Sequence, residues 1–137
     1  MSYFDDTGKH IRPELLNEEA KKAADKFVVK RPNGRTDEYR SIKNSQLRRF
    51  FNEFKGLERR LAQQPGGPEE AFRSVKPMVK MANAKVVYAQ ARKVVPQAFV
   101  TWLQDHVQAI DSARDFKAFL LHFEAVVGFC YGLNPKD

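Results

Sequence analysis

The spacing of apolar residues between positions 45 and 63 most strongly constrains the fold. Six apolar side chains recur there at intervals of one to four residues: Leu47, Phe50, Phe51, Phe54, Leu57 and Leu61. This period puts them on one face of an α-helix, and no segment of the chain shows the alternating pattern of a convincing β-strand. The segment therefore predicts a long amphipathic helix with Ser45 as its N-cap. Phe54 is expected to lie deep in the core.

Several other segments have the same helical period, and proline opens most of them. Proline suits the first turn of a helix because its missing N–H would have no partner there. We expect further helices over residues 13–27, 68–75 and 77–93, one that begins at Pro96, and one from Ser112 to Gly132. These elements predict an all-α fold, a compact bundle of five to six helices. We expect residues 1–137 to form a single domain, with residues 1–12 and about 28–44 irregular or mobile.

Composition limits the environment of the chain. The one cysteine, Cys130, cannot form an internal disulfide, which suits a reducing compartment. The N-terminus lacks the basic and apolar regions of a signal peptide. No apolar run reaches the about 20 residues of a membrane span, and the longest, residues 119–131, is interrupted by His122, Glu124 and Gly128. We therefore expect a cytoplasmic protein without a membrane partner.

The sequence offers no catalytic or metal-binding pattern. None of His10, His106, His122 and Cys130 lies near another at the spacing of zinc ligands. Gly66-Gly67 lies between prolines and lacks the lysine and hydroxyl residue of a phosphate-binding loop. His122 and Cys130 are expected to be packed core residues. We predict that the protein is not an enzyme, and that it uses no metal, cofactor or small-molecule substrate.

The positive charge of the chain, +7 in total, is concentrated in two blocks. Residues 26–60 carry 11 basic and 4 acidic side chains, and residues 71–93 carry 6 basic side chains and no acidic one. Uncompensated charges on a helix repel each other, and phosphates of a nucleic acid would relieve that repulsion. This distribution favours a polyanionic partner, although a solvated face is the alternative.

Both basic helices carry ordered stripes. On the first helix, Arg48 and Lys55 lie beside the phenylalanine face and Arg49 lies on the outer face. On the 77–93 segment, Met81, Lys85, Tyr88 and Arg92 follow at intervals of four, three and four residues, and another stripe is formed by Lys76 and Lys80. A tyrosine among cations can stack on a base or sugar. The alternative is that Tyr88 and Met81 belong to the edge of the core.

Three helical segments in order resemble the small subunit of type III-A CRISPR effector complexes, the Csm family. The first, from Ser45, reads SQLRRFFNE; the second, from Pro77, reads PMVKMANAKVVYAQAR; the third, from Asp115, reads DFKAF and continues as HFEAVVGF from His122. The resemblance covers roughly residues 40–131. It implies a compact all-α subunit without catalytic activity, which stacks in several copies along a ribonucleoprotein filament in antiviral defence.

The resemblance also implies partners and site residues. Such subunits lie beside the backbone and large subunits, which carry the cleavage activities, and help to bind target RNA paired with the guide RNA. The basic positions of the family motifs correspond to Arg48, Arg49, Lys80, Lys85 and Arg92. We predict an RNA-binding set formed by these residues together with Lys55, Lys76 and Tyr88. A subunit that serves any guide must bind backbone and duplex shape and not sequence.

Two other functions fit the same residues. In the first, the protein is a scaffold whose basic faces contact neighbouring subunits, which the surplus apolar residues of the last helix favour. In the second, it is a free-standing DNA-binding helical protein, although the sequence has no helix-turn-helix pattern.

Overall fold

The computed structural model describes residues 2–135, which form five α-helices and one 3₁₀ turn. In chain order these are the 3₁₀ turn η1 (Pro13–Leu16), α1 (Glu18–Phe27), α2 (Asn44–Gln63), α3 (Pro68–Ala91), α4 (Gln97–Ala109) and α5 (Ala113–Leu133). Within this range the only β-type pairing consists of two isolated bridges, Phe4–Ile11 and Lys30–Thr36. The predicted all-α bundle is thus confirmed. Met1 and residues 136–137 of the predicted domain lie outside the described residues.

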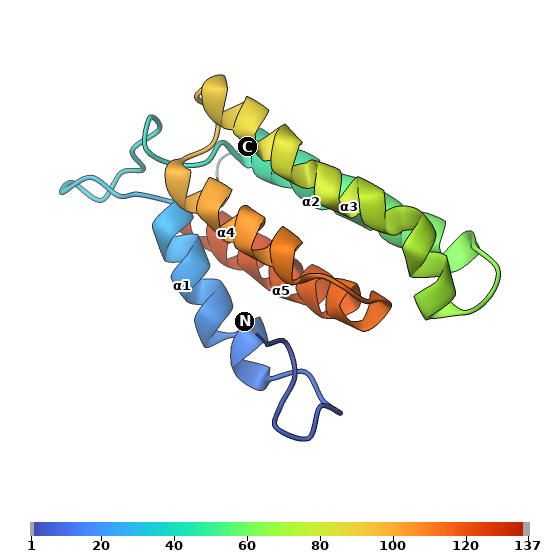
Figure 1. Cartoon of the computed structure of the whole chain (residues 1–137). Helices are drawn as coiled ribbons and strands as arrows, with labels where there is room; N and C mark the ends of the chain where they lie inside the picture. Colours follow the sequence, from blue (N-terminus) through green and yellow to red (C-terminus); the bar gives the residue numbers. More distant parts are fainter. Residues whose placement is uncertain (1, 136–137) are drawn as a thin grey trace.

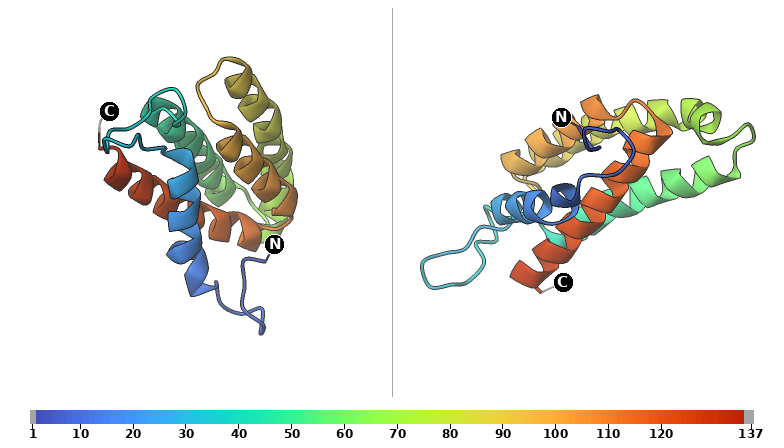
Figure 2. Two further views of the ribbon diagram at one scale, coloured as in Figure 1. Left: turned by 90° about the vertical axis from the view of Figure 1, so that its left-hand side faces the viewer. Right: turned by 90° about the horizontal axis from the view of Figure 1, so that it is seen from below.

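The long helices α2 and α3 form an antiparallel pair that covers one side of the other helices (Figure 1). The turn between them contains Gly66 and Gly67, whose φ angles of 94° and 85° are readily adopted only by glycine. Helix α3 also packs on α4, and α5 packs on both α1 and α2. Two further views show α5 crossing the bundle and the segment before α2 projecting from one end (Figure 2).

Aromatic rings dominate the core between these helices. Phe54 of α2 is 2% exposed, and its ring centroid lies 5.2 Å from that of Phe119 in α5. Trp102 of α4 lies 5.0 Å from Phe123 and 5.3 Å from Phe27 by the same measure, in both cases edge to face. Such pairs add to the stabilisation from burial alone. The predicted core position of Phe54 is confirmed.

The structure corrects the prediction of two helices over residues 68–75 and 77–93. They form one continuous helix, α3, with Pro77 inside it. The buried residues of α3 keep intervals of three and four across the proline: Phe72, Val75, Val79, Ala82, Val86 and Ala89. Burial of this unbroken face outweighs the hydrogen bond that Pro77 cannot donate.

Helix starts were predicted with mixed success. Ser112 caps α5 as expected, since its hydroxyl accepts a hydrogen bond from the Asp115 N–H at 3.1 Å. Ser45 is not an N-cap: α2 begins at Asn44 after Lys43, and the Asn44 side chain donates to the Asn134 carbonyl at 3.0 Å. The helix expected over residues 13–27 is divided into η1 and α1 by Asn17, which has non-helical backbone angles.

Helix α5 is the one described helix that is long and apolar enough to cross a membrane by length and composition. Within the bundle, Phe116, Phe119, Phe123, Val126 and Cys130 of this helix are buried against the other helices. Burial against protein explains its apolar character, as in the core helix of a globular protein.

The segment of residues 28–43 has no helix but is well hydrogen-bonded. Its base is closed by the Ile42 N–H, which donates to the Phe27 carbonyl at 2.8 Å, and by the Val29 N–H, which donates to the Ser41 hydroxyl at 2.8 Å. Its tip turns at Gly34, where φ is 84°. These bonds give the projecting loop a defined backbone path.

Candidate nucleic-acid interface

The seam between α2 and α3 opens into a surface groove of about 350 Å³. It is lined by Gln46, Arg49, Phe50, Glu53, Met81, Ala84, Lys85, Tyr88, Ala89 and Arg92. The cause is the helical register of α3. Its buried face includes Ala82, Val86 and Ala89, so residues one position earlier or later in the sequence lie at the edge of that face. The predicted stripe of Met81, Lys85, Tyr88 and Arg92 therefore lies along one groove.

One carboxylate connects the cations of the two helices. Glu53 of α2 lies 3.7 Å from Arg49 Nε, one turn away on the same helix, and 3.2 Å from Lys85 Nζ on α3. All three side chains are partly exposed, so these ion pairs add little stability. With Arg92, the groove has three cations and one anion. Arg49 was expected on the outer face of α2, but it lines the groove toward α3.

Tyr88 is the exposed aromatic residue of the groove. Its side chain is 66% exposed, and the Arg92 guanidinium lies 5.8 Å from the centre of its ring. Met81 is 47% exposed in the same groove. Both residues thus lie outside the core, unlike the alternative in which they form its edge. The groove presents an accessible ring, a thioether and cations side by side.

The structure separates Lys76 and Lys80 from this groove. Lys80 Nζ donates to the carbonyls of Val107 and Ile110 at 2.5 and 2.9 Å, so it caps the C-terminal end of α4. Asp111 lies 3.6 Å from Lys76 Nζ and 3.7 Å from Lys80 Nζ. The expectation of uncompensated charge on this stripe is wrong, because the neutralising acid comes from the connection between α4 and α5.

Lys55 and Arg48 also lie away from the groove. Lys55 Nζ is 2.6 Å from Glu58, and Glu58 lines a different groove between the end of α2 and the start of α5. Arg48 is exposed and shares the Lys55 side of α2, two turns earlier. Of the eight predicted site residues, the groove brings together four: Arg49, Lys85, Tyr88 and Arg92.

Two acidic residues that matter in these sites were not among the predicted site residues. Glu53 sits four residues after Arg49, and its pairing with a basic residue of the same helix is an alternative that the sequence already offers. Asp111 carries no such signal, because it reaches Lys76 only through the packing of α4 on α3.

Two histidines form a buried polar network remote from the groove. Tyr3 Oη and His106 Nδ1 are 2.7 Å apart, the Trp102 N–H donates to His122 Nε2 at 3.2 Å, and His122 Nδ1 lies 2.6 Å from the Leu15 carbonyl oxygen. Because His122 Nε2 accepts, its Nδ1 must carry the proton. Burial lowers the pKa of His106 to about 3 and also lowers the pKa of His122. Both imidazoles are therefore neutral near pH 7, which suits a core role for His122. Burial raises the pKa of the Cys130 thiol to about 12.

Comparison with protein families gives a match over most of the chain. The model of the family described as Csm2 Type III-A matches residues 12–132. The chain belongs to this family. Neither curated proteins nor solved structures give a significant match.

Membership in the Csm2 family makes this protein a small subunit of a type III-A CRISPR complex, which assembles with other Csm subunits. The matched region contains all five helices apart from Leu133, the final residue of α5. It also contains the whole α2–α3 groove. The resemblance seen in three sequence segments is thus confirmed. Residues 12–40, which those segments did not cover, belong to the same family match.

Proposed function

We propose that this Csm2-family protein is a non-catalytic filament subunit that binds the backbone of target RNA paired with guide RNA, without sequence specificity, in antiviral defence. The observation that carries the proposal is the α2–α3 groove, where Arg49, Lys85 and Arg92 surround the exposed ring of Tyr88. Cations neutralise phosphates with release of counterions, and the ring offers a stacking surface to a base or sugar.

The chemistry of the groove suits backbone binding. Arginine and lysine side chains on an open surface meet phosphates of any sequence, whereas base reading needs donors and acceptors fixed at base edges. The cations of the groove are at most partly neutralised by Glu53, so a phosphate can compete for them. We assign Lys55, Lys76 and Lys80 to contacts within the fold, and Arg49, Lys85, Tyr88 and Arg92 to RNA.

The proposal includes no catalytic step, metal, cofactor or small-molecule substrate. The buried histidines, His106 and His122, are held by Tyr3, Trp102 and the Leu15 carbonyl, and their lowered pKa values favour a constant neutral state. We propose a cytoplasmic location without a membrane partner, because burial within the bundle accounts for the apolar character of α5.

A second candidate function is that of a protein–protein scaffold, and one surface favours it. A groove of about 480 Å³ between the end of α2 and the start of α5 is lined largely by apolar atoms, among them those of Leu61, Phe116 and Leu120. A neighbouring subunit could cover this surface while the α2–α3 groove binds RNA. The two functions are compatible, and they differ in which surface controls assembly.

Reconstituted complexes test the proposal. Lys85→Gln with Arg92→Gln removes two groove cations, and Lys21→Gln with Lys22→Gln removes two exposed cations of α1 as the matched control. We expect the groove variant to assemble normally, to bind target RNA at least tenfold more weakly at moderate salt, and to have a shallower salt dependence. Loss of assembly with intact RNA affinity in the assembled remainder would instead support the scaffold function.

A further inference from the structure

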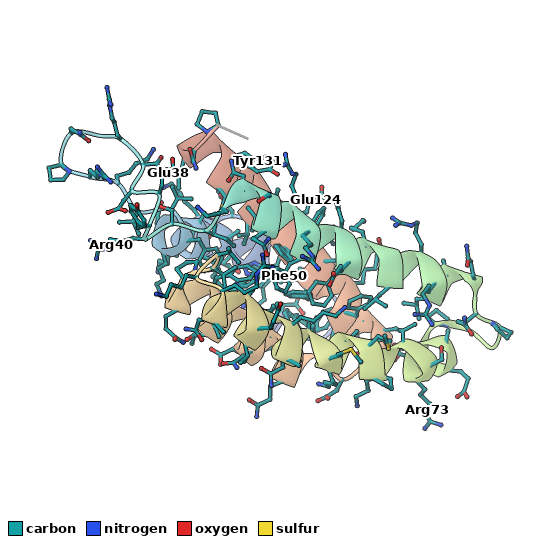
Figure 3. All side chains as sticks on the ribbon, turned by 90° about the horizontal axis from the view of Figure 1, so that it is seen from above. Glu38, Arg40, Phe50, Arg73, Glu124 and Tyr131 are labelled. Atoms are coloured by element: carbon teal, nitrogen blue, oxygen red, sulfur yellow. The ribbon has the colours of Figure 1, made fainter. Side chains whose placement is uncertain are left out.

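The loop of residues 28–43 is a second basic surface, and its last residue, Lys43, lies next to one end of the α2–α3 groove. The Lys43 N–H, at the start of α2, donates to the Val94 carbonyl just after α3 at 3.5 Å. Arg92 lies at the C-cap of α3 and Gln46 in the first turn of α2, and both line the groove. Figure 3 shows Arg40 of the loop at this end of the bundle, far from Arg73 at the other end.

The loop has a built shape and is not a loose connection. The Arg31 N–H donates to the Arg35 carbonyl and the Gly34 N–H to the Arg31 carbonyl, both at 2.8 Å. The Asn33 side chain accepts from the Arg35 N–H at 3.0 Å. The neighbouring Asp37 carboxylate accepts from the N–H groups of Tyr39 and Arg40, so this acid supports the backbone. These hydrogen bonds therefore fix the backbone positions from which the exposed side chains project.

The basic side chains of this loop outnumber its two acidic ones, Asp37 and Glu38, and unlike those of the groove they form no ion pairs within the described residues. Arg31, Arg35, Arg40 and Lys43 are exposed, and none of these side chains forms an ion pair with another residue in the described range 2–135. Lys30 differs, because its ammonium donates to the Leu133 carbonyl and to the Thr36 hydroxyl. Four exposed cations against two carboxylates give this short loop a positive surface, which favours an anionic partner.

One aromatic side chain accompanies these cations. Tyr39 is 94% exposed, more than any other large apolar side chain of the described residues. Such exposure leaves both faces of its ring open to a flat partner. Alternating cations and an exposed ring are the elements with which proteins bind unpaired nucleotides, since phosphates meet the cations and bases stack on the ring.

We propose that the loop of residues 28–43 binds single-stranded RNA that continues beyond the α2–α3 groove. Arg31, Arg35 and Arg40 contact phosphates, and Tyr39 stacks on an unpaired base. The inference rests on the proposed function, because the loop extends a groove that is itself assigned to RNA. It adds a distinct substrate form: the groove serves the backbone of the paired target, whereas the loop serves the unpaired strand.

Fluorescence anisotropy with labelled oligouridylate and the purified full-length protein tests this inference. The loop variant combines Arg31→Gln, Arg35→Gln and Arg40→Gln, and its matched control combines Lys21→Gln, Lys22→Gln and Lys117→Gln, which remove the same charge from exposed positions on α1 and α5. For the loop variant we expect the slope of log affinity against log salt to become shallower by about 2, because three phosphate contacts are lost. The control should retain the slope of the unmodified protein.

Substitution of Tyr39 provides a second, independent test of the inference. Tyr39→Ala should weaken oligouridylate binding by about tenfold with no change in salt slope, and Tyr39→Phe, which keeps the ring, should restore the affinity. Equal affinity of Tyr39→Ala and the unmodified protein, or equal loss in the loop variant and its control, would overturn the inference. So would a loop variant that loses only assembly with the other subunits, since the loop would then bind protein.

The groove variant Lys85→Gln with Arg92→Gln shows whether the loop inference fails alone or together with the proposed function. Its binding is measured with an RNA duplex, and that of the loop variant with oligouridylate. If the groove variant loses duplex binding while the loop variant keeps full affinity for oligouridylate, the loop inference fails and the proposed function stands. If the groove variant keeps full affinity for the duplex, the proposed function fails and the loop inference that rests on it fails too.

Discussion

Helices α2 and α3 contribute residues both to the aromatic core, which excludes water, and to the α2–α3 groove, which is open to solvent. In the core, Phe54 and Val86 are at most 2% exposed, and their neighbours exclude water. In the groove, Lys85 and Tyr88 lie one and two residues from Val86 and are open to solvent. A rotation of about 100° about the helix axis separates Val86, which supports the fold, from Lys85, which is available to a partner. Substitutions on the two sides should therefore have separate effects.

The largest change in stability is expected from substitution of Phe54. Phe54→Ala removes a ring that packs against Phe116, Phe119 and Phe123, and it should lower the free energy of unfolding by about 3–5 kcal/mol. Urea unfolding followed by circular dichroism measures this change. A variant that unfolds at the same urea concentration as the unmodified protein would mean that this side of α2 is not the core.

A pH titration should affect the core and not the groove. The folded protein keeps His106 neutral down to about pH 3, whereas an unfolded histidine binds a proton below about 6.5. The unfolded state therefore binds more protons between these values, so the free energy of unfolding should fall by about 1.4 kcal/mol for each pH unit below 6.5. Urea unfolding at pH 7, 6 and 5 measures this slope. His106→Gln should reduce this slope and leave the part that His122 contributes, because burial lowers the pKa of that imidazole as well.

Lys80 and Lys85 offer the sharpest test, because they lie five residues apart on α3 and we assign them different roles. Lys80→Ala removes the donor to the Val107 and Ile110 carbonyls and should cost about 1–2 kcal/mol of stability, with RNA affinity almost unchanged. Lys85→Ala should cost less than about 0.5 kcal/mol and weaken RNA binding. Thermal unfolding and anisotropy on both variants decide the assignment, and the reverse pattern would exchange their roles.

Glu53 should show the smallest effect, and one of opposite sign. Glu53→Gln frees Arg49 and Lys85 from their shared carboxylate, so RNA affinity should rise by about two- to fivefold at low salt. The melting temperature should stay within a degree or two of the original. Glu58→Gln, which frees Lys55 outside the groove, is the matched control and should leave affinity unchanged.

The sequence was sufficient for the parts that depend on local periodicity. The face of α2 with Phe54, the cap formed by Ser112 and the stripe from Met81 to Arg92 follow from intervals along one helix. The break expected at Pro77 was wrong, because burial of a continuous face of about five turns outweighs the cost of one proline within the helix.

What the sequence did not supply was the relation between helices. Lys80 and Lys85 are equivalent as basic positions of one helix, and only the packing of α4 gives Lys80 two carbonyl acceptors and Asp111. In the same way, Arg49 faces a partner helix because α3 folds back along α2. Such placements depend on contacts between residues distant in the chain, which spacing within one helix does not encode.

The position of Trp102 has a practical consequence for spectroscopy. It is the one tryptophan of the chain, and it is partly buried against the core, beside Phe27, Phe99, Phe123 and the two buried histidines. Tyr39 and Tyr88, by contrast, lie on the surface. Intrinsic tryptophan emission should therefore report whether the bundle is intact, and it should not change when RNA binds to the groove or the loop. A single sample can report its folding by emission of Trp102 while a dye on the RNA reports binding.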